Sequence, residues 1–291
     1  MNDSKVGSFD DIISIKLNRL KQPNRPINGI SSFSLKQTYI NSRECPHCGS
    51  HYVLSNGNYK GRKRYLCKNC GKSYNDLTKT PFSGIHDLNK ILKYLNCMIS
   101  GDSIRKAATT VNVTVATSFS WRHKLLDGLN RLPAPKMKNV KEMMELEIPY
   151  SHKGQRSNPT KAQRKTKLSA VFVCDRTGKL DSDSIAFSQR ARNPLWSRIN
   201  DISNEHTDLI CSTNFNNNVD FLKTKLKSSN SSYTQPNTIN QIVTLWQGWM
   251  KRFHGVASKY LSNYLHWFDY LDNSLFKPGR IQDFLQLLLK H

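Results

Sequence analysis

Two cysteine pairs, Cys45-Cys48 and Cys67-Cys70, have the spacing of metal ligands. Each CxxC pair brings two thiols to one side of a tight turn, and the glycine that follows each pair lets the backbone turn sharply. Four cysteine thiolates give Zn²⁺ the tetrahedral set that it prefers, with no position left open for a substrate. The spacing therefore predicts a closed structural zinc site; the alternative is four unrelated free thiols.

The segment between the two pairs is suited to a small β-hairpin, with strands at 52–54 and 64–66 and a turn at 56–58. We expect a zinc ribbon over residues 41–78, after a polar N-terminal segment over residues 1–40. Basic side chains crowd the hairpin and could contact a phosphate backbone, with a solvated basic surface as the alternative. The residues predicted to contact DNA here are Lys60, Arg62, Lys63 and Arg64.

The 291-residue chain has 44 Lys and Arg against 21 Asp and Glu, a formal net charge of +23. Because like charges repel, a polyanionic partner such as nucleic acid is expected. No apolar run reaches the roughly 18 residues that cross a bilayer, so no membrane partner is expected. Seven cysteines without an export signal indicate a reducing compartment, the bacterial cytoplasm or nucleoid.

A helix-turn-helix is predicted within residues 84–132. Ser103 and Thr114 are good N-caps for two successive helices, and Asn112-Val113 supplies the turn between them. A short helix followed by a longer basic helix is the layout that places the second helix in the major groove of DNA. Three side chains are expected to face the core: Ala116, Phe119 and Leu125. The predicted DNA contacts, expected to face outward, are Thr117, Ser118, Arg122 and Lys124.

From about residue 143 the pattern changes to short apolar strands, turns and later helices. Buried strands are predicted at 171–173 and 209–211, and a helix over 239–253. The expected fold class is therefore α/β, with a mixed domain over residues 142–270 and a C-terminal helix over 271–291. The apolar stretch at 281–289 would either cover the core or mediate self-association, as in a homodimer.

Several segments carry a resemblance to a known family. The four-cysteine segment is followed by TSFSWRHKLL at 117–126, KGQR at 153–156, VFVCDRTG at 171–178, LICS at 209–212 and WMKRFHGVASKYLSNYL at 249–265. Together they resemble the zinc-ribbon insertion-sequence transposases whose catalytic domain has an RNase H-like fold. The resemblance covers residues 40–270. It implies an N-terminal zinc ribbon and helix-turn-helix followed by an RNase H-like mixed α/β domain, with DNA contacts from Lys251 and Arg252.

In that family, acidic side chains of the RNase H-like core bind two divalent metal ions for phosphoryl transfer on DNA. The resemblance places Glu147 at the first family Asp, Thr213 at the second and Asn240 at the third position. Thr213 cannot supply a carboxylate, and Mg²⁺ needs several oxygen ligands in strict geometry. The implied catalytic site is therefore degenerate, and Mg²⁺ is expected only if the site is active.

These patterns lead us to expect a transposase-like DNA-binding protein that takes double-stranded DNA and structural Zn²⁺ and lacks strand-transfer activity. Two alternatives stay open. One is an active two-metal DNA transposase, and the other is a zinc-ribbon module that binds protein or RNA.

Overall fold

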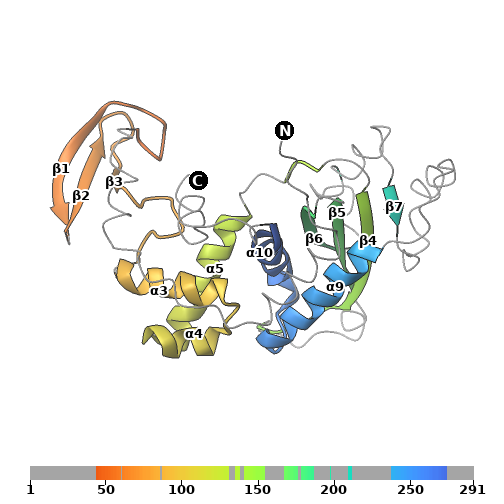
Figure 1. Ribbon diagram of the computed structural model, residues 1–291. Helices are drawn as coiled ribbons and strands as arrows, with labels where there is room; N and C mark the ends of the chain where they lie inside the picture. The colour runs from red at the N-terminus through yellow and green to blue at the C-terminus, as the bar shows by residue number, and fades with distance from the viewer. Residues whose placement is uncertain are drawn as a thin grey trace, which may run out of the picture. The chain divides into compact units, whose positions relative to one another are not determined.

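The computed structural model describes residues 44–59, 61–85, 87–130, 135–137, 141–154, 167–175, 178–186, 197, 209–211 and 237–273. These residues form two compact units, one within 44–130 and one within 135–273. Both helices and strands are present, so the protein is mixed α/β (Figure 1). The predicted polar segment 1–40 and residues 274–291 of the predicted C-terminal helix lie outside the described residues.

The first unit begins with a three-stranded antiparallel sheet in the order β1-β2-β3. Its strands are β1 (Val53–Tyr59), β2 (Arg62–Cys67) and β3 (Ser73–Asn75). The predicted hairpin arms pair as expected, with Leu54 opposite Leu66. The predicted turn at 56–58 is wrong, because β1 continues to Tyr59. Gly57, with φ at 70°, lies in an irregularity of this strand, where a glycine accommodates the locally altered backbone.

Three helices follow, α3 (Leu88–Ile99), α4 (Ile104–Val111) and α5 (Val115–Leu129). The predicted N-caps Ser103 and Thr114 are confirmed, since each side chain accepts a hydrogen bond from the backbone N–H three residues later. Asn112 ends α4 in the left-handed conformation, with φ at 55°. Val113 N–H then donates to Ala108 O at 3.0 Å, which closes a Schellman turn between α4 and α5.

A hydrogen-bonded network joins the three helices through their buried faces. Tyr94 Oη of α3 donates to Ser118 O at 2.6 Å, and Ser118 Oγ donates to Ile104 O at 2.8 Å. Arg122 Nη2 donates to Asp102 O at 2.9 Å, and its guanidinium lies 5.6 Å from the centroid of the Tyr94 ring. These contacts fix the rotation of α5 about its own axis relative to α3 and α4.

The predicted orientation of α5 is wrong for four side chains. Ser118 and Arg122, expected outside, are 0% exposed, whereas Ala116 and Phe119, expected inside, are exposed. Leu125 is buried as predicted. The prediction placed side chains by their polarity. Hydrogen bonds to backbone carbonyls instead allow a serine and an arginine to lie inside.

The second unit contains a four-stranded sheet in the order β6-β5-β4-β7. Its strands are β4 (Lys141–Pro149), β5 (Lys167–Asp175), β6 (Leu180–Ala186) and β7 (Leu209–Cys211). The first three strands along the chain pair antiparallel, and β7 pairs in parallel with β4. The strands predicted at 171–173 and 209–211 are confirmed within β5 and β7.

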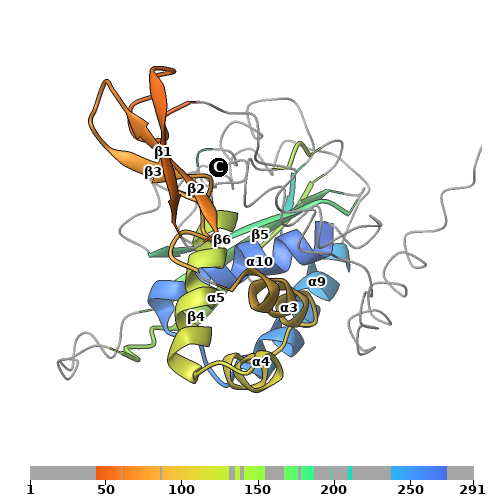
Figure 2. The same cartoon turned by 90° about the vertical axis from the view of Figure 1, so that its left-hand side faces the viewer.

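Two helices lie along one face of this sheet, as Figures 1 and 2 show. Helix α9 (Asn237–Met250) packs against β4 and β5, and α10 (Leu261–Asn273) packs against β6. The helix predicted over 239–253 is confirmed as α9, except that Lys251–Phe253 form a 3₁₀ turn. The Trp249 ring lies 4.9 Å from that of Trp267 between ring centroids, which ties the two helices together.

A buried carboxyl group joins β6 to α10. Asp269 accepts hydrogen bonds from the backbone N–H and from Oγ of Ser182, both at 2.7 Å. Burial, together with the nearby charge of Asp181, raises the pKa of Asp269 well above its usual value. The Ser182 hydrogen bonds oppose this rise.

Substituting Arg122 by Ala should lower the free energy of unfolding of the helices α3, α4 and α5, hereafter the helical unit, by about 2 kcal/mol. The reason is that a buried hydrogen bond to a charged group is lost. Hydrogen exchange of the α5 amides measures this opening free energy for that unit alone. Lys124→Ala, at an exposed position of the same helix, is the control and should change it by less than about 0.5 kcal/mol. If both substitutions change the opening free energy by the same small amount, the buried hydrogen bond of Arg122 does not stabilise the helices as we infer.

Candidate metal centre and nucleic-acid interface

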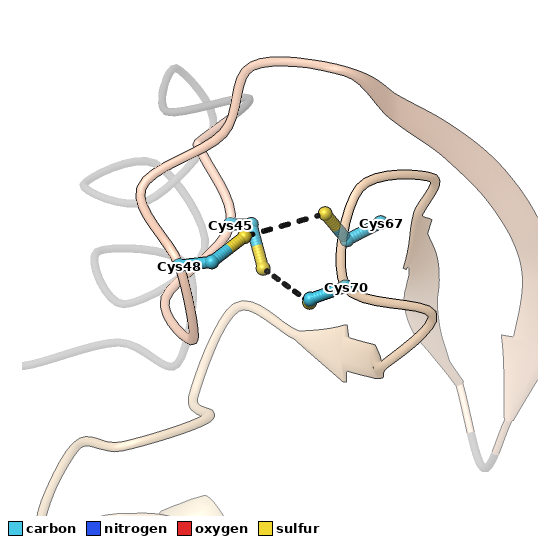
Figure 3. A group of neighbouring side chains, drawn as sticks. All are labelled: Cys45, Cys48, Cys67 and Cys70. Carbon is cyan, nitrogen blue, oxygen red and sulfur yellow. Dashed lines mark hydrogen bonds between the residues drawn. The ribbon is translucent and has the colours of Figure 1, made fainter.

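The four cysteines of the two CxxC pairs come together at one end of the three-stranded sheet (Figure 3). Their Sγ atoms all lie within 4.8 Å of one another, with Cys45–Cys70 at 3.7 Å and Cys48–Cys67 at 3.6 Å. Sulfur ligands about 2.3 Å from a tetrahedral Zn²⁺ lie about 3.8 Å apart. The set therefore fits a metal ion such as zinc.

The backbone builds two matching turns around this set. Gly49 N–H donates to Cys45 O at 2.8 Å, and Gly71 N–H donates to Cys67 O at 2.9 Å. The two glycines have φ values of 72° and 69°, in the left-handed region that glycine adopts without strain. The sequence correctly predicted that each CxxC pair would turn at its following glycine.

Two of the four thiols have pKa values shifted in opposite directions. Hydrogen bonds from the backbone, first from Cys70 and then from Asn69, lower the pKa of Cys67 to about 6. A backbone hydrogen bond at Ser50 lowers the pKa of Cys48, but desolvation and hydrogen bonds with the other three thiols raise it to about 11. A metal ion held by four thiolates must therefore displace protons that the set binds with unequal strength.

The ligands themselves make up much of the small core of this sheet. Cys45 and Cys67 are buried beside Tyr74, and Tyr65 packs against them with its ring stacked 5.5 Å from that of Tyr74. A core this small stabilises a fold weakly, so a bound metal would supply much of the folding free energy of the sheet.

The predicted DNA contacts of the sheet divide between its two faces. Successive side chains of a strand point to opposite faces, so Arg62 and Arg64 share one face of β2 and Lys63 points to the other. Arg64 donates to Ser73 Oγ at 2.9 Å. Lys60 lies outside the described residues.

On α5, the residues predicted to contact DNA differ in their exposure. Lys124 is exposed, although its Nζ donates to Ser83 O at 3.0 Å, and Thr117 is half-buried beside the cap residue Thr114. The fully buried Ser118 and Arg122 are not available to DNA.

Basic side chains also gather at one end of the sheet unit. Lys251 and Arg252 are exposed, as the family resemblance implies for DNA contacts. Sequence reasoning missed that the chain after β4 docks beside them: Ser151 N–H donates to Ser258 Oγ at 2.8 Å, and Lys153 Nζ donates to His254 O at 3.3 Å. Lys153, the first residue of the KGQR segment, thus joins this surface, which only a contact between distant parts of the chain could reveal.

The positions implied for catalysis are placed only in part. Glu147 is exposed near the end of β4, and Asn240 is exposed in the first turn of α9, while Thr213 lies outside the described residues. No sequence pattern singles out Glu142, whose buried Oε2 accepts a hydrogen bond from the backbone N–H of Ile239 at 2.9 Å. This carboxylate lies at the N-terminus of α9, where the helix dipole favours negative charge.

Within the described part of the chain, the cysteines are the only group of three or more His, Cys, Asp or Glu side chains that could hold a metal ion. No helix there is long and apolar enough to cross a membrane.

Comparison with known proteins finds one similarity that spans most of the chain. The chain is 24% identical over 259 residues to a protein of Halobacterium salinarum described as an uncharacterized protein in transposable element ISH50. The match covers 81% of this chain and 87% of that protein. No family model matches the chain, and no solved structure matches it.

Substituting Cys67 by Ser should abolish the binding of one zinc ion per chain and remove hydrogen-exchange protection from residues 44–78, because three thiolates no longer close the tetrahedron. Metal analysis of the purified full chain and hydrogen exchange measure the two effects. Cys97→Ser, at a buried cysteine of α3 outside the set, is the matched control and should keep the zinc. Equal zinc content in both variants would contradict a four-cysteine metal site.

Proposed function

We propose that this protein is a transposase-like DNA-binding protein of an insertion sequence, with structural zinc and without strand-transfer activity. The observation that carries the proposal is the similarity to the protein of a transposable element. That match covers 81% of the chain, which is more than either unit contains, so it includes residues of both. A shared zinc-binding segment alone would not extend so far.

The first unit supports a DNA-binding role. We interpret residues 41–78 as a zinc ribbon, on the basis of two matching turns that bring four thiols to tetrahedral spacing. We interpret α4 and α5 as a helix-turn-helix, because a three-residue turn joins a short helix to a longer one. Residues 44–130 contain thirteen Lys and Arg against five Asp and Glu, a net charge of +8 that suits a phosphate backbone.

The second unit supports an RNase H-like core. Strand β7 lies parallel to β4, with Cys211 opposite Met143. Parallel strands end at the same edge of a sheet, so residues that follow β7 and residues late in β4 are directed to that edge. These are the positions that the family resemblance assigns to the first two acids, and α9 carries the third.

Loss of strand transfer is inferred from the residue types at those positions. Glu147 retains a carboxylate, and Asn240 is a residue type that the family resemblance allows at the third position, but Thr213 has no carboxylate. A pair of Mg²⁺ ions would be held only with further acids. The buried carboxylates of Glu142 and Glu145 do not supply them together, because side chains three residues apart on β4 point to opposite faces of the sheet.

Binding to duplex DNA tests the proposal. The affinity of the full chain for a labelled duplex should fall by a factor of roughly 10³ or more between about 50 and 200 mM salt, because phosphate contacts release counterions. The double substitution Lys251→Ala with Arg252→Ala should lower the slope of log affinity against log salt by about 2, and Lys93→Ala on α3 should leave it unchanged. No affinity for duplex, or affinity that does not depend on salt, would contradict the proposal.

A further inference from the structure

The start of α5 exposes two large apolar side chains. Val115 is 50% exposed and Phe119 is 42% exposed. Within the described residues, the other exposed large hydrophobic side chains all belong to the β1 region: Tyr52, Leu54 and Tyr59. Val115 and Phe119 are four residues apart, so they are neighbours on one face of the helix.

Phe119 is held in place by contacts along the same face. Its ring lies 4.1 Å from that of His123 between centroids, and His123 Nδ1 lies 2.8 Å from Phe119 O. Ser118 and Arg122 follow Val115 and Phe119 by three residues each, so the face of α5 that they bury adjoins the apolar one and fixes the rotation of the helix. The apolar face formed by Val115 and Phe119, hereafter the α5 apolar face, is therefore presented in a defined direction.

The chemistry of this face fits one feature of duplex DNA. The major groove is lined by hydrogen-bonding groups except at thymine, whose C5-methyl group is apolar and is contacted by side chains such as Phe. The residues that reach base edges from the second helix of a helix-turn-helix lie near its N-terminus, which is where Val115 and Phe119 are. The net charge of +8 over residues 44–130 favours a polyanion over a protein as the occupant.

We propose that Val115 and Phe119 read thymine methyl groups in the major groove, and so select sites that carry thymine at the bases facing α5. The inference rests on the proposed function, because it needs α5 to enter the groove. It adds the side chains that choose the sequence, whereas phosphate contacts supply affinity without choice.

Replacing thymine by deoxyuridine tests this directly, because uracil pairs as thymine does and lacks only the methyl group. A duplex is first selected from a random library by binding to the full chain. It is then compared with the same duplex carrying deoxyuridine at each thymine in turn. At the contacted positions the affinity should fall roughly four-fold for each methyl group lost.

The matched variants are Val115→Ala, Phe119→Ala and, as the control at an exposed position of the same helix, Ser120→Ala. The first two should lose discrimination between thymine and uracil at their own positions, and Ser120→Ala should keep it. Equal affinity of the natural chain for both duplexes would overturn the inference alone, while the salt-dependent binding still supports the proposed function. Failure to bind any duplex would overturn both. Self-association that is lost in Phe119→Ala, without a thymine preference in the natural chain, would identify the face as a contact between copies of the chain and overturn the inference.

Discussion

The dominant physical constraint on this chain is the mutual repulsion of 44 cationic side chains that face only 21 anionic ones. Carboxylates are too few to pair with them, and several described cations donate to backbone carbonyls instead. Lys124 reaches Ser83 O, and the buried Arg122 reaches Asp102 O. Such contacts position the side chains but leave the positive charge uncompensated. A polyanion would offset this positive charge. The same charge that destabilises the isolated fold through repulsion therefore favours binding to DNA.

Around the four cysteines, a bound metal ion with its thiolates would offset part of this repulsion. Four thiolates around a divalent ion carry a net charge of −2, within a sheet whose strand β2 holds Arg62, Lys63 and Arg64. The metal–thiolate group would then stabilise a sheet that has a very small core, and it would place negative charge among the cations of that sheet. The helical unit that follows does not depend on a metal ion for its stability, because α3, α4 and α5 share an extended apolar core and a buried hydrogen-bonded network.

The cysteine turns and the helix caps followed from the sequence, whereas the turn predicted at 56–58 and the contacts between distant residues did not. The thiol cluster could be predicted because spacing within each CxxC pair fixes its geometry, and the caps Ser103 and Thr114 because capping acts over three residues. The buried face of α5 could not, because the buried Arg122 is stabilised by a carbonyl twenty residues away and by the ring of Tyr94 on another helix. Glu142 was missed for the same reason, since its partner Ile239 is distant in the chain.

The proposed function requires that the chain binds duplex DNA without breaking its strands. The most direct test incubates the full natural chain with an end-labelled duplex and Mg²⁺ or Mn²⁺, and compares it with the Thr213→Asp variant. One native gel shows whether a complex forms, and one denaturing gel shows whether the strands are intact. The proposed function predicts a retarded complex with intact strands for the natural chain. Strands nicked by the natural chain in a metal-dependent manner would contradict it.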